Sequence, residues 1–316
     1  MIASAPAIAR LLGLGLALLG IVLGLGAAGC DCGSGGGATR CATRTPMLAE
    51  PVTIGSVTLT PDGRSLTITG LEASSRWSVA RGPVLAVDPV APAMDAIEAQ
   101  TPDAVLLLGG FDTGPRLAEL VDALSELEVP VLLLPGPRDH VEEIEEVLAE
   151  RGARHLVSLA GFQLVRAGAV QLVLAPGGMD PRYLPDPEGC SMSETELADA
   201  IDASDASLVR FLVGFDAPAG APLTAGIDGV EAGSEAVRRR LEQAGIRGGL
   251  FAGPDGRPGV PFDGAMPSRG PSPGLRLIVP PLLGPSPEGP DGARPSAGPT
   301  LVVLGPQGLA VPPTHP

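Results

Sequence analysis

Aromatic residues and histidines are scarce in this chain of 316 residues. Aromatics make up 3% of the sequence, and there are 3 histidines. Hydrophobic residues still account for 44% of the chain, so we expect a core built from Leu, Val, Ala and Ile. With so few histidines and no Cys-x-x-Cys spacing, the sequence gives poor support to a zinc-type metal site.

Positive charge and the common hydrolase motifs are also in short supply. The chain has 21 basic and 36 acidic residues, which gives a net charge of −15. An acidic surface repels nucleic-acid phosphates, so we expect no nucleic-acid partner. No Ser-His-Asp or Cys-His arrangement can be argued, and Cys190 has no His near it in sequence, so a nucleophilic serine or cysteine is not supported. The sequence has no internal repeat either.

Glycine and proline, in contrast, are abundant, with 44 and 35 copies. Such a content predicts long irregular stretches. Residues 253–274 and 284–299 are the two longest, and we expect proteases to cut there first.

The first thirty residues follow the pattern of a secretory signal. Residues 1–10 carry one basic side chain, residues 11–26 are apolar, and Ala27-Ala28-Gly29-Cys30 follows. Small residues directly before a Cys resemble the lipobox of bacterial lipoproteins. We therefore expect a signal peptide over 1–29 and a lipid on Cys30. The protein would lie in the bacterial cell envelope, anchored to a membrane and facing the periplasm or the exterior. The alternative is an uncleaved anchor over residues 11–28.

The rest of the chain is expected to form a flexible tether over 30–50 and a single domain over 51–316. Cys32 and Cys41 lie in that tether and can pair in an oxidising compartment. Cys190 is then left unpaired.

The hydrophobic patterns predict an α/β fold. Residues 52–68 read as a hairpin with its turn at 61–63, which Trp77 and Val79 extend. From residue 84 onward strands and helices alternate, which predicts a parallel βαβ core. The expected strands there are 84–87, 104–108 and 129–134, and the expected helices are 92–100, 115–127 and 141–151.

The second half is expected to add shorter strands, two helices and a closing hairpin. A capping box at 193–196 opens the first of these helices, which should end near Asp205. The second covers 234–244, and the hairpin joins 301–304 to 309–311. The expected strands are 155–157, 162–165, 172–175, 208–214, 249–252 and 275–279.

This order of elements resembles the calcineurin-like metallophosphoesterases over about residues 84–311. That family's signatures, Asp-x-His, Gly-Asp, Gly-Asn-His-Asp/Glu, a His and Gly-His-x-His, each follow a buried strand of a βαβ sandwich. The segment 229–253, a helix start with a basic helix and a strand into a Gly, is the most specific part. The corresponding loops here are Asp88-Pro89-Val90, Gly109-Gly110, Gly136-Pro137-Arg138-Asp139, Gly214-Phe215 and Gly253-Pro254-Asp255-Gly256.

Most of the metal ligands that the resemblance implies are missing. Asp88 and Asp139 match, whereas Val90, Gly110, Pro137, Arg138, Phe215, Pro254 and Gly256 stand where the family has ligands. A two-metal site needs about six N or O ligands, so we expect no metal cofactor. Arg138 puts a positive charge in the loop and is a candidate anion-binding residue.

Nearby side chains offer a reduced site as an alternative. Asp88, Asp112, Asp139, His140 and Asp255 can be drawn around one pocket, with His140 as the candidate catalytic residue and Asp88 and Asp139 as candidate metal ligands. Two divalent metals are expected only in that case. The simpler interpretation is that Asp112 and Asp139 cap the helices that follow them.

The sequence therefore predicts a metallophosphoesterase-like sandwich that has lost its chemistry. We expect a pseudoenzyme that binds a partner or ligand at the cell envelope. A divergent phosphoesterase with a reduced metal site and a structural envelope protein are the alternatives.

Overall fold

A computed structural model describes residues 39–82, 91–111, 113–179, 189–220, 233–243, 245–253, 262–266, 275–280 and 298–312. These residues all belong to one compact unit, Gly37–Pro316. The signal segment and Cys30 lie outside the described residues. Among the residues described, no helix has the length and apolarity to cross a bilayer.

One sheet has six strands in the order β17-β16-β5-β6-β7-β8. Its middle strands are parallel, as expected of a βαβ core, and two of them are continuous runs of buried apolar residues. The strands are β5 Ser75–Arg81, β6 Ala104–Leu108, β7 Val131–Leu134, β8 Leu156–Ser158, β16 Thr300–Gly305 and β17 Gly308–Ala310.

The second sheet has nine strands in the order β14-β15-β13-β12-β10-β9-β4-β3-β2. Here β10, β12, β13 and β15 run parallel, and an antiparallel meander, β2 to β4, joins through β9. The strands are β2 Val52–Ile54, β3 Val57–Asp62, β4 Ser65–Thr69, β9 Leu164–Ala167, β10 Val170–Ala175, β12 Val209–Gly214, β13 Gly248–Phe251, β14 Phe262–Met266 and β15 Leu275–Val279.

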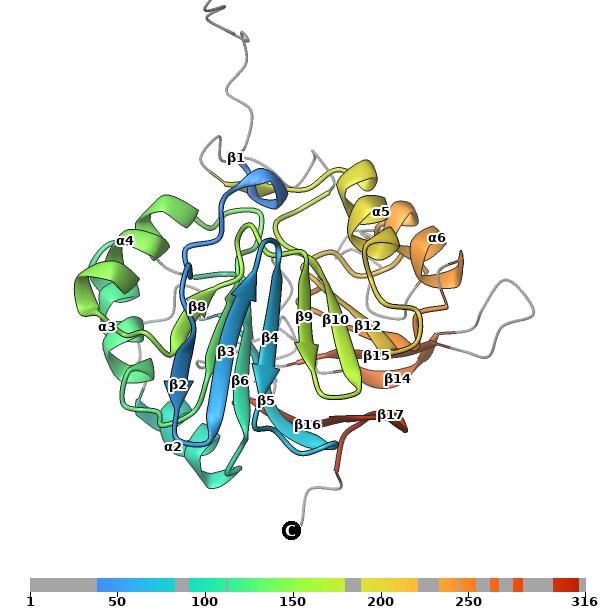
Figure 1. The fold of residues 1–316 in the computed structure, drawn as a ribbon. Coiled ribbons are helices and arrows are strands. Elements are labelled where there is room, and N and C mark those ends of the chain that lie inside the picture. Colours follow the sequence, from blue (N-terminus) through green and yellow to red (C-terminus); the bar gives the residue numbers. More distant parts are fainter. Residues whose placement is uncertain are drawn as a thin grey trace, which may run out of the picture. The chain divides into compact units, whose positions relative to one another are not determined.

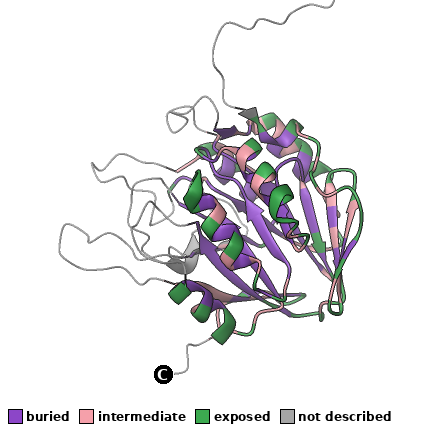
Figure 2. Ribbon diagram, turned by 90° about the vertical axis from the view of Figure 1, so that its left-hand side faces the viewer, coloured by how far each residue is buried: buried purple, intermediate pink, exposed green. Residues whose placement is uncertain are grey.

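The two sheets pack face to face, and helices cover their outer faces (Figure 1). Apolar side chains of both sheets, such as Leu106 and Leu132 from one and Leu172 and Phe211 from the other, form the central core. Helices α2 Ala91–Ala99, α3 Pro115–Leu124 and α4 Val141–Arg151 pack on the six-stranded sheet. Helices α5 Glu194–Asp202 and α6 Glu235–Gln243 pack on the other. Each helix buries one side and exposes the other (Figure 2). The α/β sandwich predicted from the sequence is confirmed.

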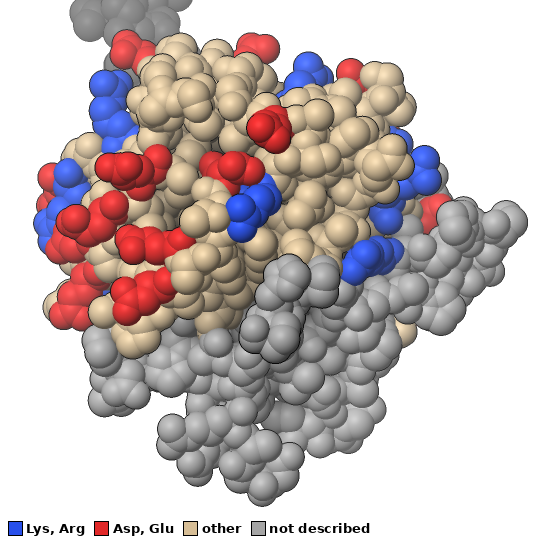
Figure 3. Space-filling view, turned by 90° about the horizontal axis from the view of Figure 1, so that it is seen from below, with Lys and Arg blue, Asp and Glu red and all other residues tan. Residues whose placement is uncertain are grey.

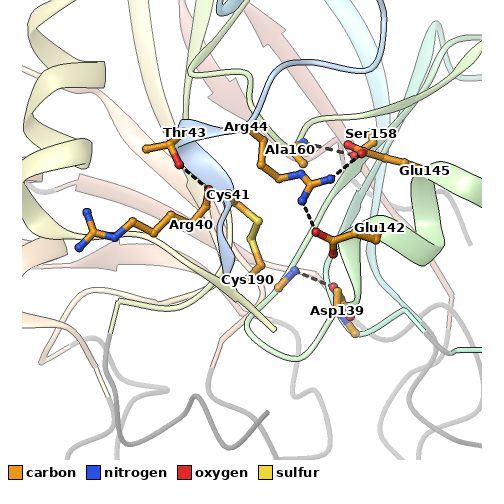
Figure 4. Close-up of a disulfide and its surroundings, with 12 residues drawn as sticks. Arg40, Cys41, Thr43, Arg44, Asp139, Glu142, Glu145, Ser158, Ala160 and Cys190 are labelled. Atoms are coloured by element: carbon orange, nitrogen blue, oxygen red, sulfur yellow. Dashed lines mark hydrogen bonds and ion pairs between the residues drawn. A yellow bond between two sulfur atoms is a disulfide. The ribbon is translucent and has the colours of Figure 1, made fainter. Parts of the chain in front are cut away.

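The N-terminal segment is attached to the domain earlier than expected. Strand β1 Thr39–Arg40 pairs with β11 Cys190–Ser191, and the 3-10 helix η1 Cys41–Thr43 follows. Cys41 forms a disulfide with Cys190, and both residues are fully buried (Figure 4). The sequence left open whether Cys41 pairs with Cys32, which would leave Cys190 free; the structure pairs Cys41 with Cys190 instead. Sequence spacing could not reveal this bond, because 149 residues separate the two cysteines.

Side chains of the same segment fasten it further. Arg44 pairs with Glu142 and Glu145 of α4, the latter at 2.9 Å. The backbone amide of Gly161 donates to the carbonyl of Cys41 at 3.0 Å. Residues 39–50, expected as the end of a flexible tether, therefore form a strap fixed to the domain. We refer to residues 39–50 below as the strap.

Two further strand predictions need correction. Trp77 and Val79 do not extend the first hairpin but belong to β5, in the other sheet. The strand next to β6 is thus β5, which ends at Arg81, whereas the strand expected at 84–87 lies outside the described residues. Part of the loop expected at 253–274 is strand β14. The turn expected at 61–63 is shifted, because Pro61 and Asp62 end strand β3.

Candidate functional site

Parallel strands of both sheets end at one edge of the sandwich, where the family signatures were expected. The amide of Gly82, after β5, donates to the carbonyl of Gly109, after β6, at 2.7 Å. The amide of Gly177, after β10, donates at 2.7 Å to the carbonyl of Pro135, after β7. The second bond joins the two sheets. This edge therefore brings the loops after β5, β6, β7 and β10 together, as strand ends do in open α/β folds.

Asp139 is the buried carboxylate of this edge, with 1% of its surface exposed. Its carboxylate accepts hydrogen bonds from three backbone amides. They come from Gly110 at 3.0 Å, Phe111 at 2.8 Å and Gly136 at 2.6 Å. Asp139 was expected to cap the helix that begins at Val141, but His140 is the N-cap of α4 and makes no side-chain capping bond. The carboxylate instead joins the loops after β6 and β7.

The loops after β6 and β7 approach each other too closely for larger side chains. A Cβ added at Gly109 would lie 2.8 Å from the Cα of Gly136 and 2.9 Å from Cδ2 of Phe215. The Phe215 ring, which is buried, thus rests on both glycines. Gly110, where the family has a bridging Asp, has a φ of 73°, a region that an Asp side chain adopts only with strain.

Arg81 lies at the end of β5 and is buried, with 8% of its surface exposed. Its Nη1 donates to the carbonyl of Ala252, which follows β13 in the other sheet, at 2.7 Å. The amides of Ala252 and Gly253 donate in turn to the carbonyls of Gly214 and Phe215, each at 3.1 Å. A fixed positive charge therefore bridges the two sheets at this edge.

Sequence reasoning missed Arg81 because the first strand was expected at residues 84–87. Strand β5 is in fact buried without a break from Trp77 to Arg81, so no alternation of polar and apolar residues marks Arg81 in the sequence. Asp88, in the place expected to follow that strand, and Val90 lie outside the described residues. Asp112, Pro254, Asp255 and Gly256 lie outside them too.

The remaining predicted residues sit at the rim of this edge. Pro137 is buried and Arg138 is exposed, whereas Arg81 is buried. His140 is partly buried, and its Nδ1 lies 3.8 Å from Glu143 Oε2. Of the predicted candidates that lie within the described residues, the structure thus places Arg138, Asp139 and His140 on one loop, and the Asp139 carboxylate bonds to the loop after β6.

The disulfide flanks the same edge. Cys41 and Cys190 pack with Val141, the first residue of α4, and with Ala160. Gly177 lies directly against Cys190, since a Cβ on Gly177 would be 2.8 Å from its Sγ. Figure 4 shows the disulfide, which joins the strap to Cys190 of β11, together with Asp139 on the loop after β7. The strap therefore borders the candidate site.

These residues do not fit the two metal ions that the fold family implies. The Asp139 oxygens already accept three amides, Phe215 presents carbon atoms, and Arg81 adds a positive charge at the same strand ends. Within the described ranges, no group of three or more His, Cys, Asp or Glu residues is placed to hold a metal ion. Hard divalent cations need several oxygen or nitrogen ligands at once.

A cavity in the described part of the chain lies away from these strand ends. It has a volume of about 360 Å³ and is mostly apolar. Met47 and Leu48 of the strap line it together with the end of α4 and strand β8. None of the predicted site residues contributes to its walls.

Comparison with solved structures supports the fold. A crystal structure matches 75% of this chain and 99% of its own at 11% identity, with a TM-score of 0.52. The crystal structure of TT1561 from Thermus thermophilus matches 75% of this chain and 97% of its own at 15% identity, with a TM-score of 0.47. No protein-family model and no curated protein matches the sequence. Both structures have the calcineurin-like metallophosphoesterase fold, and the first shows that this chain shares it.

Proposed function

We propose that this protein is a non-catalytic member of the metallophosphoesterase fold class that acts by binding a partner or ligand. The observation that carries the proposal is the donor set at the strand ends. Gly110 offers no ligand, Phe215 covers the glycine loops, and the Asp139 carboxylate is engaged by backbone amides. Without metals there is no activated water and no clamp for phosphoryl oxygens.

A phosphoesterase assay tests this proposal against the reduced-site alternative. The full chain, purified in detergent, is loaded with excess manganese or zinc and given a phosphomonoester and a phosphodiester. We expect no metal-dependent hydrolysis, because no described cluster can hold the ions. Metal-dependent hydrolysis that is lost in Asp88→Ala but kept in the control Asp62→Ala, a residue of β3, would contradict the proposal and establish the alternative.

We also propose that the protein is a lipid-anchored protein of the bacterial cell envelope. The Ala27-Ala28-Gly29-Cys30 sequence supports the anchor. The Cys41–Cys190 disulfide supports a compartment outside the cytoplasm, because disulfides persist in oxidising surroundings.

Membrane fractionation of Cys30→Ala tests the anchor. The variant should stay uncleaved or leave the membrane fraction, because the acyl chains would have no attachment site. Cys32→Ser serves as the control, since it removes a cysteine that belongs neither to the lipobox nor to the Cys41–Cys190 disulfide. A Cys30→Ala protein that fractionates and migrates like the parent would refute the lipid anchor.

A further inference from the structure

Three buried side chains cross-link the strand ends at the candidate site. Arg81 reaches from β5 of the six-stranded sheet to the carbonyl of Ala252, directly after β13 of the nine-stranded sheet. The two residues are 171 positions apart in the sequence. Phe215 crosses in the opposite direction, because it follows β12 of the nine-stranded sheet and rests on Gly109 and Gly136 of the six-stranded one. The two contacts connect the same pair of sheets.

Asp139 supplies the third link, within the six-stranded sheet. Its carboxylate accepts hydrogen bonds from backbone amides of the loop after β6 and of the loop after β7. Hydrogen bonds to an ionised acceptor are among the stronger ones in proteins. The contacts of Phe215 and Arg81 are also linked to each other. The amide of Gly253, the residue after the Ala252 that accepts from Arg81, donates to the carbonyl of Phe215.

A metal ion that takes ligands from separate loops stabilises the fold, since its binding energy is available only when those loops are together. A chain that loses the ligands loses this cross-link. Arginine is charged at every pH that a protein experiences, and burial of that charge is unfavourable unless it is hydrogen-bonded. The presence of a buried arginine at this edge therefore needs a structural explanation.

We propose that Arg81, Asp139 and Phe215 form a clasp made only of protein atoms, which holds the strand ends together in place of metal ions. The positive charge of Arg81 and the apolar ring of Phe215 join the sheets, and Asp139 fixes the glycine loops on which the ring rests. The folded state then has no need of divalent metal. The clasp is a claim about stability, and the unfolding experiment below tests it. The proposal that the protein is non-catalytic is tested separately, by the hydrolysis assay.

Thermal unfolding of the full chain in detergent tests the clasp. The unfolding midpoint of the parent should be the same with a chelator and with excess manganese or zinc. Arg81→Met should lower it by about 5–10 °C, and metal should not restore it. Arg76→Met is the matched control. Arg76 lies on the same strand but is exposed and bonds to Thr101, so its loss should lower the midpoint by no more than about 3 °C.

Two results would overturn the clasp: a parent midpoint that falls in chelator, and an Arg81→Met midpoint no lower than that of Arg76→Met. If Arg81→Met does not fold, Arg81→Lys keeps the charge and loses the planar fork of donors. Hydrogen exchange of Arg81→Lys should then rise at Gly109–Phe111 and at Ala252 and Gly253, with α5 unchanged as an internal reference. Exchange equal to the parent's at those amides would also refute the proposal.

Discussion

Asp139 stands directly before a helix in the sequence, where carboxylates most often act as caps. In the fold its oxygens instead accept two amides from the loop after β6 and one from its own loop after β7, and α4 begins without a side-chain cap. Local spacing predicts the residue type that a helix start prefers, but not a partner 29 residues away. The function of this carboxylate can therefore be identified only in the folded chain.

Replacement of Asp139 should be among the most destabilising single changes at this edge. Asp139→Ala leaves three amides without their acceptor, and we expect the free energy of unfolding to fall by about 3–5 kcal/mol. Asp139→Asn keeps one acceptor oxygen and should lose about half as much. Chemical denaturation measures the change. The exposed Asp122, paired with Arg151 on the surface, is the control, and Asp122→Ala should change stability by about 0.5 kcal/mol. Equal effects of Asp139→Ala and Asp122→Ala would disprove this account of Asp139.

Glu145 gives a prediction for pH dependence. Burial raises the pKa of its carboxyl group, and the Arg44 guanidinium opposes this only in part. A carboxyl whose folded pKa is raised contributes stability that is present at low pH and is lost as pH rises through that pKa. The unfolding midpoint of the parent minus that of Glu145→Gln should therefore be largest near about pH 4 and fall toward about pH 7. A difference that grows with pH would show that the ion pair outweighs burial.

The absence of the family's ligands at single positions was predictable from the sequence, but the buried Arg81 was not. Gly110, Pro137 and Phe215 are readable because each follows a strong strand or a recognisable signature. Arg81 was hidden because β5 contains Ser and Arg, whereas residues 84–87 form a short apolar run that looks more like a strand. A single apolar run cannot be placed in a sheet without its neighbours.

At the level of elements, long apolar runs and clear periodicity gave the most accurate predictions. Strand β6, helix α4 and strand β15 have the predicted bounds, and the capping box of α5 is formed between Ser193 and Glu196. Edge strands were harder, since β14 lies in a stretch rich in Gly and Pro. The pairing of β1 with β11 depends on a disulfide between distant residues and left no local signal.

The strap should depend on its disulfide. Cys41→Ser removes a cross-link that closes a loop of 149 residues, which corresponds to about 4 kcal/mol in the chain-entropy description. We expect a lower unfolding midpoint and faster proteolysis at residues 43–50. Cys32→Ser is the control, because Cys32 has no part in this bond. Equal protease resistance of Cys41→Ser and the parent would show that the strap is held by Arg44 and the backbone bonds alone.

On the scale of the whole molecule, charge is distributed unevenly over the surface. Figure 3 shows acidic side chains gathered on the flank that helices α2–α4 occupy in Figure 1. Exposed carboxylates on these helices include Asp95, Glu98, Glu119, Glu142 and Glu146. Such a flank disfavours nucleic acids and fits the proposal of another kind of partner.

The sandwich as a whole shows that a shared fold does not fix the chemistry at its strand ends. Two sheets, their helices and the converging strand ends are kept, while the side chains at those ends cross-link the sheets. The fold class was predictable from the order of elements. The protein's activity depends on the site, and here the site argues against the activity of the fold family.

Metal analysis of the purified full chain tests this central claim most directly. The protein is incubated with excess manganese or zinc, desalted, and its bound metal is measured by mass spectrometry. Because Arg81, Asp139 and Phe215 leave no adequate ligand set among the described residues, we predict less than about one metal ion per chain. Two tightly held metal ions per chain, lowered by Asp88→Ala, would contradict the account.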